Sequence, residues 1–226
     1  MALTLSGLYP ILDARYLPAC VQAGAGAGHE AWDEARHRML GTVVRALAAA
    51  GVTVMQYRNK QDEDAQVLRD AVCLRREAPP HLRIVLNDRA HLVEASGCDG
   101  VHVGQGDLQV GEARRLVGER RIVGLSTHDE AQVRAGDAAA ADYLAIGPVY
   151  ATGSKDSSEP VVGLAGVLRA RTVTQKPLVA IGGITLERAA EVRDAGADSV
   201  AVISALFRDV ETPLEKLAED FLRLFR

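Results

Sequence analysis

Short apolar runs alternate with longer stretches of helical periodicity along most of this chain. Such alternation is typical of repeated βα units, in which helices cover a buried parallel sheet. The apolar runs predict eight strands, at residues 8–12, 52–57, 83–86, 100–103, 122–125, 143–146, 178–181 and 199–202. The longer stretches predict helices, among them 65–77, 109–117, 130–138, 186–195 and 213–225.

Eight βα repeats favour a closed barrel over an open sheet. A barrel leaves no strand unpaired at an edge, and 226 residues is an ordinary length for a barrel of this kind. We therefore predict an α/β fold, a (β/α)8 TIM barrel that forms a single domain over residues 1–226. An open, doubly wound sheet is the alternative. Ala-Gly repeats lengthen the first connection, and we expect an atypical flexible insertion at about 18–38.

Composition narrows the class of function. The chain has 26 basic and 30 acidic residues, so it lacks an overall positive field and we expect no nucleic-acid partner. No apolar run is long enough to cross a bilayer, which predicts a cytoplasmic protein without a membrane partner. The three cysteines are far apart and predict free thiols rather than a zinc site. A homo-oligomer is possible, but the sequence does not define one.

Polar residues recur at the carboxyl ends of the predicted strands, which a barrel gathers at one rim. Gln56, Arg58 and Lys60 alternate at the end of the second strand, so the pleat is expected to point all three toward the barrel mouth. Two cations and an amide in this arrangement predict an anion-binding site. The alternative is a pair of surface cations on an exposed edge strand.

Two carboxylates follow neighbouring strands and suggest a metal site. Asp88 follows the third predicted strand and Asp107 the fourth, so both can reach one hard cation whose shell is completed by water and phosphate oxygens. The alternative for each is an N-cap of the next helix. Together with Arg58 and Lys60, the two carboxylates predict a site for Mg²⁺ and pyrophosphate.

A second anion site is predicted at the last two strands. Gly182-Gly183 follows the seventh strand and Ile203-Ser204 the eighth, and backbone N–H groups at such helix starts often bind phosphate. A simple tight turn is the alternative at the glycines. Two separate anion sites imply two phosphorylated substrates. His128 is either a general base or a packing residue at a helix start, and His102 is expected to face the barrel wall or form a structural hydrogen bond.

These motifs, taken in order, resemble the thiamine-phosphate synthase family from about residue 8 to residue 207. The resemblance rests on Gln-x-Arg-x-Lys at 56–60, Asn-Asp at 87–88, Val-His-x-Gly-Gln-x-Asp at 101–107, Gly-x-Ser-x-His at 124–128 and Thr-Gly-Ser-Lys at 152–155. It continues through Gly-Pro at 147–148, Gly-Leu at 163–164, the Gly-Gly segment at 181–184 and Gly-Ala-Asp at 196–198.

The resemblance implies a transferase of thiamine biosynthesis. Such an enzyme joins 4-amino-2-methyl-5-(diphosphooxymethyl)pyrimidine to the carboxylated tautomer of thiazole phosphate, with one Mg²⁺ per subunit assisting a dissociative loss of pyrophosphate. By position, the pyrimidine diphosphate would be held by Gln56, Tyr57, Arg58, Asn59, Lys60, Asn87, Ser126 and Lys155. Of these, Arg58, Lys60, Ser126 and Lys155 would be catalytic. The thiazole phosphate would contact Thr152, Gly153, Ser154, Gly183, Ile203 and Ser204, and the metal would bind Asp88 and Asp107.

The sequence departs from the family pattern at three positions. Asn59 stands where the family usually has Glu, Gly106 where an acidic residue is common, and Ser154 where Thr is usual. A thiazole tautomerase of the same fold is the nearest alternative, because it carries a working histidine in the same Ser-x-His motif. A non-catalytic sensor of phosphate ligands and a phosphate-binding sugar isomerase are further alternatives. We also expect the polar segment 153–160 to close over bound substrates.

Overall fold

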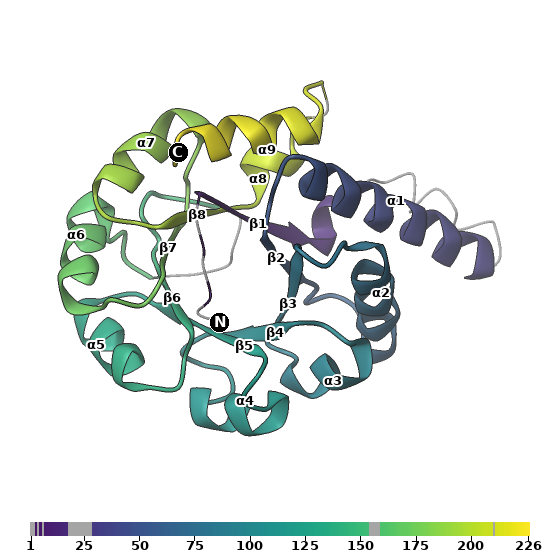
Figure 1. The fold of residues 1–226 in the computed structure, drawn as a ribbon, viewed down its shortest axis with the longest axis horizontal. Helices are drawn as coiled ribbons and strands as arrows, with labels where there is room; N and C mark the ends of the chain where they lie inside the picture. The colour runs from purple at the N-terminus through teal and green to yellow at the C-terminus, as the bar shows by residue number, and fades with distance from the viewer. Residues whose placement is uncertain (1–2, 4, 6, 18–28, 154–158, 210) are drawn as a thin grey trace.

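Eight parallel strands close into a barrel in the computed structural model, which describes residues 3, 5, 7–17, 29–153, 159–209 and 211–226 (Figure 1). The strands are β1 (Gly7–Asp13), β2 (Val54–Arg58), β3 (Arg83–Asn87), β4 (Gly100–Val103), β5 (Ile122–Thr127), β6 (Tyr143–Ile146), β7 (Leu178–Ile181) and β8 (Ser199–Val202). Each strand pairs with its neighbour in sequence, and β8 closes onto β1. The prediction of a closed barrel is confirmed, and the open sheet is wrong.

Helices surround the barrel on its outer face (Figure 1). They are α1 (His29–Ala49), α2 (Asp64–Glu77), α3 (Val93–Ser96), α4 (Val110–Val117), α5 (Glu130–Ala138), α6 (Gly163–Val173), α7 (Leu186–Asp194), α8 (Ser204–Phe207) and α9 (Leu214–Arg223). Short 3₁₀ turns, η1 (Ala14–Tyr16) and η3 (Ala90–Leu92), follow β1 and β3. Residues 29–38 of the expected insertion form the first turns of α1, whereas residues 18–28 lie outside the described part of the chain.

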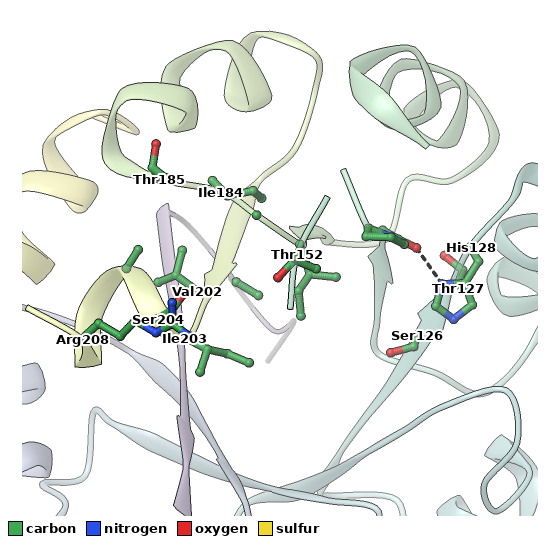
Figure 2. A pocket seen from close by; sticks show the side chains of 17 residues that line it. Ser126, Thr127, His128, Thr152, Ile184, Thr185, Val202, Ile203, Ser204 and Arg208 are labelled. Atoms are coloured by element: carbon green, nitrogen blue, oxygen red, sulfur yellow. Dashed lines mark hydrogen bonds between the residues drawn. The ribbon is translucent and has the colours of Figure 1, made fainter. Parts of the chain in front are cut away.

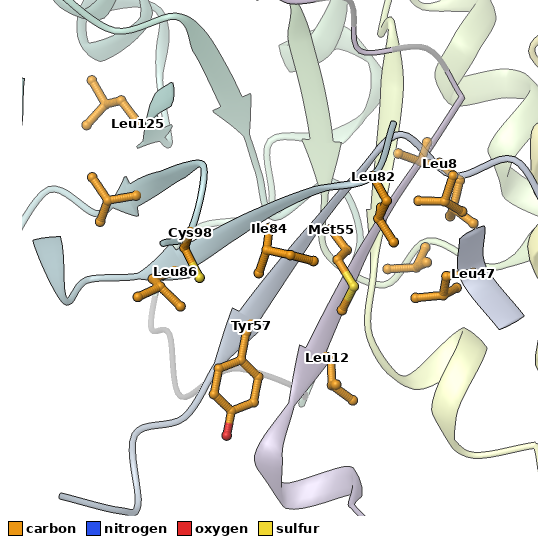
Figure 3. Packing of buried hydrophobic residues seen from close by; sticks show 14 of the residues in the cluster. Leu8, Leu12, Leu47, Met55, Tyr57, Leu82, Ile84, Leu86, Cys98 and Leu125 are labelled. Atoms are coloured by element: carbon orange, nitrogen blue, oxygen red, sulfur yellow. The ribbon is translucent and has the colours of Figure 1, made fainter. Parts of the chain in front are cut away.

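Alternate residues of each strand face two different apolar layers. The larger layer lies between the strands and the helices, and Figure 3 shows Met55, Ile84 and Leu86 within it. The smaller layer fills the barrel and includes Tyr9 and Tyr143. Burying a Leu or Ile side chain contributes about 1.5–3 kcal/mol, so the long outer layer carries much of the stability.

The barrel interior is partly polar, because two of its large residues are tyrosines whose hydroxyl groups need hydrogen-bond partners when buried. The end of the barrel at which the strands finish carries most of the other polar groups described below. Among the helices of the described residues, none combines the length and the apolar character that a bilayer crossing requires.

Candidate functional site

In β2, the side chains of Gln56 and Arg58 point into the barrel, as predicted from the alternation of side chains along a strand. Val54, two residues before Gln56, belongs to the layer inside the barrel, so Gln56 and Arg58 share its face. The strand ends at Arg58, and Lys60 lies beyond it in a bend. The path of the loop after β2 therefore places Lys60 at the rim, and the alternation of side chains along the strand, which the sequence analysis invoked, does not extend to it.

Arg58 is held by a carboxylate that the sequence analysis did not identify. Arg58 and Asp13 are directly paired in the register between β2 and β1. The Arg58 guanidinium donates to Asp13 Oδ2, and both side chains are buried. Arg15 also donates to Asp13, with Nε 3.2 Å from Oδ1. The sequence signal for Asp13 is its place as the last residue of a strand, at the same rim as the other polar groups.

The side chains of Tyr57 and Asn59 point away from the barrel mouth. Tyr57 lies in the outer apolar layer and donates its hydroxyl hydrogen to Asp70 Oδ2 at 2.5 Å. Asn59 donates to the Tyr57 hydroxyl at 3.0 Å, and its oxygen accepts from the backbone N–H groups of Gln61 and Asp62 at 3.1 Å. The structure thus gives both side chains a role in holding the loop after β2, while the contact of these two residues with a diphosphate stays a prediction from the resemblance.

Asp88 and Asp107 are brought together at the ends of β3 and β4. Lys60 Nζ lies 3.0 Å from Asp88 Oδ2, and the backbone N–H of Gly104 donates to Asp107 Oδ2 at 2.9 Å. Neither carboxylate caps a helix, because the residue before η3 is Arg89 and the residue before α4 is Gln109. The N-cap alternative is wrong for both.

The backbone and the pKa values of this pair indicate an unusual environment. Asp88 has φ +63°, a conformation that costs a non-glycine residue about 1 kcal/mol or more. Burial, and then the hydrogen bond to Asp107, raises the pKa of Asp88, although Lys60 opposes the rise. Burial also acts to raise the pKa of Asp107, but the hydrogen bonds with Asp88 and the Gly104 amide lower it overall. Two adjacent carboxyl groups are suited to bind a cation, because a cation relieves the repulsion between their negative charges.

The donor set matches a hard divalent cation that keeps most of its own water. Among the described residues, no group of three or more His, Cys, Asp or Glu side chains is placed to hold a metal. Proteins usually bind Mg²⁺ next to a phosphorylated substrate through one or two carboxylates, and water and phosphate oxygens fill the remaining coordination positions. The residues present therefore fit Mg²⁺ better than zinc, which takes three or four protein ligands.

Two buried amide groups on the inner face have atoms without a partner among the described residues. Gln56 Oε1 is a buried acceptor and Asn87 Nδ2 a buried donor, and neither makes a hydrogen bond there. Leaving such an atom unpaired costs about 1–3 kcal/mol, so unpaired buried atoms are uncommon in folded proteins. A polar ligand at the barrel mouth would satisfy both.

A cavity of about 210 Å³ opens over the ends of β5 to β8 (Figure 2). Ser126 and His128 lie on one side of it, and Ile203, Ser204 and Arg208 on the other. Thr152, Gly182, Gly183, Thr185 and Ala205 also line it, and most of its surface is apolar. This cavity and the Asp88–Asp107 pair occupy different parts of the rim, so the rim has two chemically distinct halves.

The glycine turn after β7 is built for close approach of the backbone. Gly182 has φ +104° and Gly183 φ +63°, conformations that favour glycine. A Cβ on Gly183 would lie 2.7 Å from the Ala151 carbonyl oxygen, so no larger residue fits. Arg208, at the end of α8, is a cation at this cavity that the sequence analysis missed, and its guanidinium lies 5.8 Å from the Tyr16 ring centroid.

His128 faces the same cavity with one ring nitrogen engaged. Its Nδ1 lies 2.6 Å from the Gly147 carbonyl oxygen, which can only accept, so Nδ1 carries the hydrogen and Nε2 is the acceptor nitrogen of a neutral ring. Asp129, not His128, caps α5, by accepting from the Gln132 N–H at 2.8 Å. Gly153 is exposed, while Ser154, Lys155 and most of the predicted closing segment lie outside the described residues.

Comparisons with known proteins agree with this arrangement. Residues 30–206 match a family model described as thiamine monophosphate synthase. The chain is 51% identical over 180 residues to a thiamine-phosphate synthase of Koribacter versatilis, covering 80% of this chain and 83% of that protein. It is 44% identical over 165 residues to one of Methanoculleus marisnigri, covering 73% and 78%. A solved thiamine phosphate pyrophosphorylase from Pyrococcus furiosus superposes with a TM-score of 0.78 at 27% identity, covering 97% of this chain and 95% of that one.

Proposed function

The chain belongs to the thiamine monophosphate synthase family, and we propose that it joins an aminopyrimidine methyl diphosphate to a thiazole phosphate. The products are thiamine monophosphate and pyrophosphate, and a thiazole that enters as its carboxylated tautomer also releases carbon dioxide. The observation that carries the proposal is the division of the rim into a half with paired carboxylates and cations and a half with an apolar cavity and a glycine turn. Each half suits one of the two substrates.

The half formed by β1 to β4 is assigned to the diphosphate. Lys60 lies beside the carboxylate pair, and Arg58 is held in place by Asp13, so the two cations are oriented before a ligand arrives. A bound Mg²⁺, held by Asp88 and Asp107, would neutralise charge on the departing pyrophosphate. Fixed charges aimed at a leaving group are among the largest contributions to catalysis, because they need no reorganisation during the reaction.

The half formed by β5 to β8 is assigned to the thiazole phosphate. The apolar lining suits the heterocycle, while the N–H groups around Gly183 and Ser204 suit the phosphate. Arg208 adds a positive charge at the edge of the same cavity. Held there, the thiazole nitrogen can capture the pyrimidine methylene as the carbon–oxygen bond to pyrophosphate breaks, so the enzyme supplies orientation and no protein nucleophile is needed.

The proposal is tested by incubating the protein with both phosphorylated heterocycles, with and without Mg²⁺, and measuring thiamine monophosphate and pyrophosphate. Equal amounts of the two products, formed only with Mg²⁺, are expected. Conversion of the thiazole phosphate carboxylate to its tautomer without coupling would identify a tautomerase instead. Binding of the ligands without any turnover would identify a sensor.

A further inference from the structure

A chain of buried polar side chains crosses the interior of the barrel and ends at Ser126. Gln56 Nε2 lies 3.4 Å from the Tyr9 hydroxyl, and the Tyr9 hydroxyl lies 2.6 Å from that of Tyr143. The Tyr143 hydroxyl is 2.8 Å from His102 Nδ1, and His102 Nε2 is 2.8 Å from Ser126 Oγ. Five strands contribute one residue each: β2, β1, β6, β4 and β5. Only Ser126 of the five lines the cavity over β5 to β8.

Donor and acceptor chemistry favours one direction for the hydrogens in this chain. The Gln56 amide nitrogen can only donate, so the Tyr9 oxygen accepts and the Tyr9 hydrogen goes to Tyr143. Tyr143 then donates to His102 Nδ1, which places the ring hydrogen on Nε2 and directs it at Ser126 Oγ. In the reverse order, the Tyr9 hydrogen would face only donors. The forward order is favoured because each hydrogen of this buried series then has an acceptor.

Two further observations concern the tyrosines of this chain. Burial raises the pKa of Tyr9 to about 12 and raises that of Tyr143 well above its ordinary value, so both phenols keep the hydrogens that the chain needs. The place of the Tyr143 ring is made by Gly124, its register partner on β5, where a Cβ would lie 2.1 Å from Tyr143 Cζ. The ring therefore occupies a site that only glycine at this position leaves open.

We infer that Tyr143 and His102 are positioning residues, which hold Ser126 Oγ as an acceptor from His102 and so leave its own hydrogen to be donated to a ligand at the barrel mouth. The opposite end of the chain has the complementary group, because Gln56 Oε1 is a buried acceptor without a partner among the described residues. One donor and one acceptor suit an aminopyrimidine, which carries ring-nitrogen acceptors and an amino donor. The inference rests on the proposed function and adds the residues that set the direction of its hydrogen bonds.

The direct test is the tautomer of His102 in the unmodified protein. Two-dimensional NMR of protein with ¹⁵N-labelled histidine distinguishes a hydrogen on Nε2 from one on Nδ1, and the His102 signals are assigned by their loss in His102→Asn. A hydrogen on Nε2 is expected at neutral pH. A hydrogen on Nδ1 would reverse the chain and overturn the inference. This measurement does not depend on any variant having activity.

The second test is a double-mutant cycle between Tyr143→Phe and Ser126→Ala, measured as kcat for coupling. Tyr143→Phe removes the hydrogen that keeps the Nδ1 side of His102 occupied, and we expect kcat to fall about tenfold with an unchanged KM for the thiazole phosphate. If Tyr143 acts through Ser126, the same change in the Ser126→Ala background has little further effect. A full additional tenfold fall there would show that Tyr143 only supports the core.

Ser199→Ala is the control, because it removes a buried hydroxyl that donates to the Gly7 carbonyl oxygen and lies outside the chain. We expect less than a threefold change in kcat, and a fall equal to that of Tyr143→Phe would contradict the inference. An inactive parent protein would refute the proposed function. An active parent whose His102 hydrogen lies on Nδ1, or whose two single variants are additive, would refute the positioning role alone.

Discussion

Asp13→Asn isolates the contribution of the buried ion pair that holds Arg58. The substitution keeps the volume of the side chain and removes its charge, leaving the buried Arg58 guanidinium without a counter-charge. Breaking a buried pair from one side costs about 3–5 kcal/mol. The value at Asp13 is expected near about 3 kcal/mol, because the amide oxygen of Asn still accepts one hydrogen bond.

Thermal unfolding gives this cost as a shift in Tm. For a protein of this length each kcal/mol lowers Tm by about 2–4 °C, so Asp13→Asn is expected to lower it by about 6–12 °C. The matched control is Arg15→Ala, which removes the other cation on Asp13. The Arg15 side chain is 33% exposed and its pair is partly screened by water, so about 1 kcal/mol or less is expected.

The double variant Asp13→Asn with Arg58→Gln removes the unpaired charge and should recover at least half of the lost stability. Added Mg²⁺ and inorganic pyrophosphate should raise Tm more in Asp13→Asn than in the parent, because the unpaired guanidinium then has an anion to bind. A fall in Tm no larger than that of Arg15→Ala would refute the reasoning, since it would mean that water already solvates Arg58.

Three further predictions concern the two halves of the rim. Ser204→Ala should raise KM for the thiazole phosphate more than for the pyrimidine diphosphate, and Lys60→Ala should do the reverse, as steady-state kinetics with each substrate varied in turn will measure. Asp88→Asn or Asp107→Asn should slow coupling by roughly a hundredfold or more and weaken its dependence on Mg²⁺, measured by metal titration. Arg208→Ala should raise KM for the thiazole phosphate about five- to tenfold, with partial rescue by Arg208→Lys.

Each of these has an outcome that contradicts it. If Ser204→Ala and Lys60→Ala affect the same substrate, the rim does not divide in two. Full activity of both Asp variants without added Mg²⁺ would remove the metal assignment. Arg223→Ala, which removes an exposed arginine of α9 that pairs with Glu219 and Asp220, is the control for Arg208. Equal changes in KM for Arg208→Ala and Arg223→Ala would show that the effect comes from the net charge of the protein and not from a contact of Arg208 with the ligand.

The strands could be predicted from the sequence because each is a short apolar run, most are followed by a polar segment, and several are preceded by a glycine-containing turn. Six of the eight predicted strands begin at the residue where the structure begins them, and the second differs because Val52 and Thr53 precede the ladder of β2. The inward orientation of Gln56 and Arg58 could also be predicted, because side chains along a strand alternate between its two faces. That alternation also predicts an outward Tyr57 and Asn59, which the positional resemblance assigned to the ligand.

Other features could not be predicted because they depend on which strands are neighbours and at what register. Asp13 and Arg58 are 45 residues apart in sequence, and only the register of β1 against β2 places them side by side. The role of Lys60 likewise depends on the path of a loop. Arg208 follows a helix of four residues, too short to show a periodic pattern. Polar residues at strand ends thus identify the rim, but not the pairs formed on it.

One residue beside the buried chain from Gln56 to Ser126 could be interpreted from the sequence, whereas the hydrogen bonds of the chain could not. His102 was expected to face the barrel wall or to form a structural hydrogen bond, and hydrogen bonds join it to Tyr143 and Ser126. Neither could be assigned without the barrel, because the partners lie on other strands. Gly124 is different: glycine weakens a strand unless another group needs its space. Gly124 stands within an otherwise apolar run, two residues before Ser126. A glycine at such a position indicates that a large side chain from a neighbouring strand occupies the space beside it. The motif Gly-x-Ser-x-His therefore needs its glycine to leave space for the Tyr143 ring. Two residues later, the same motif places Ser126 at the cavity where a ligand is expected to bind.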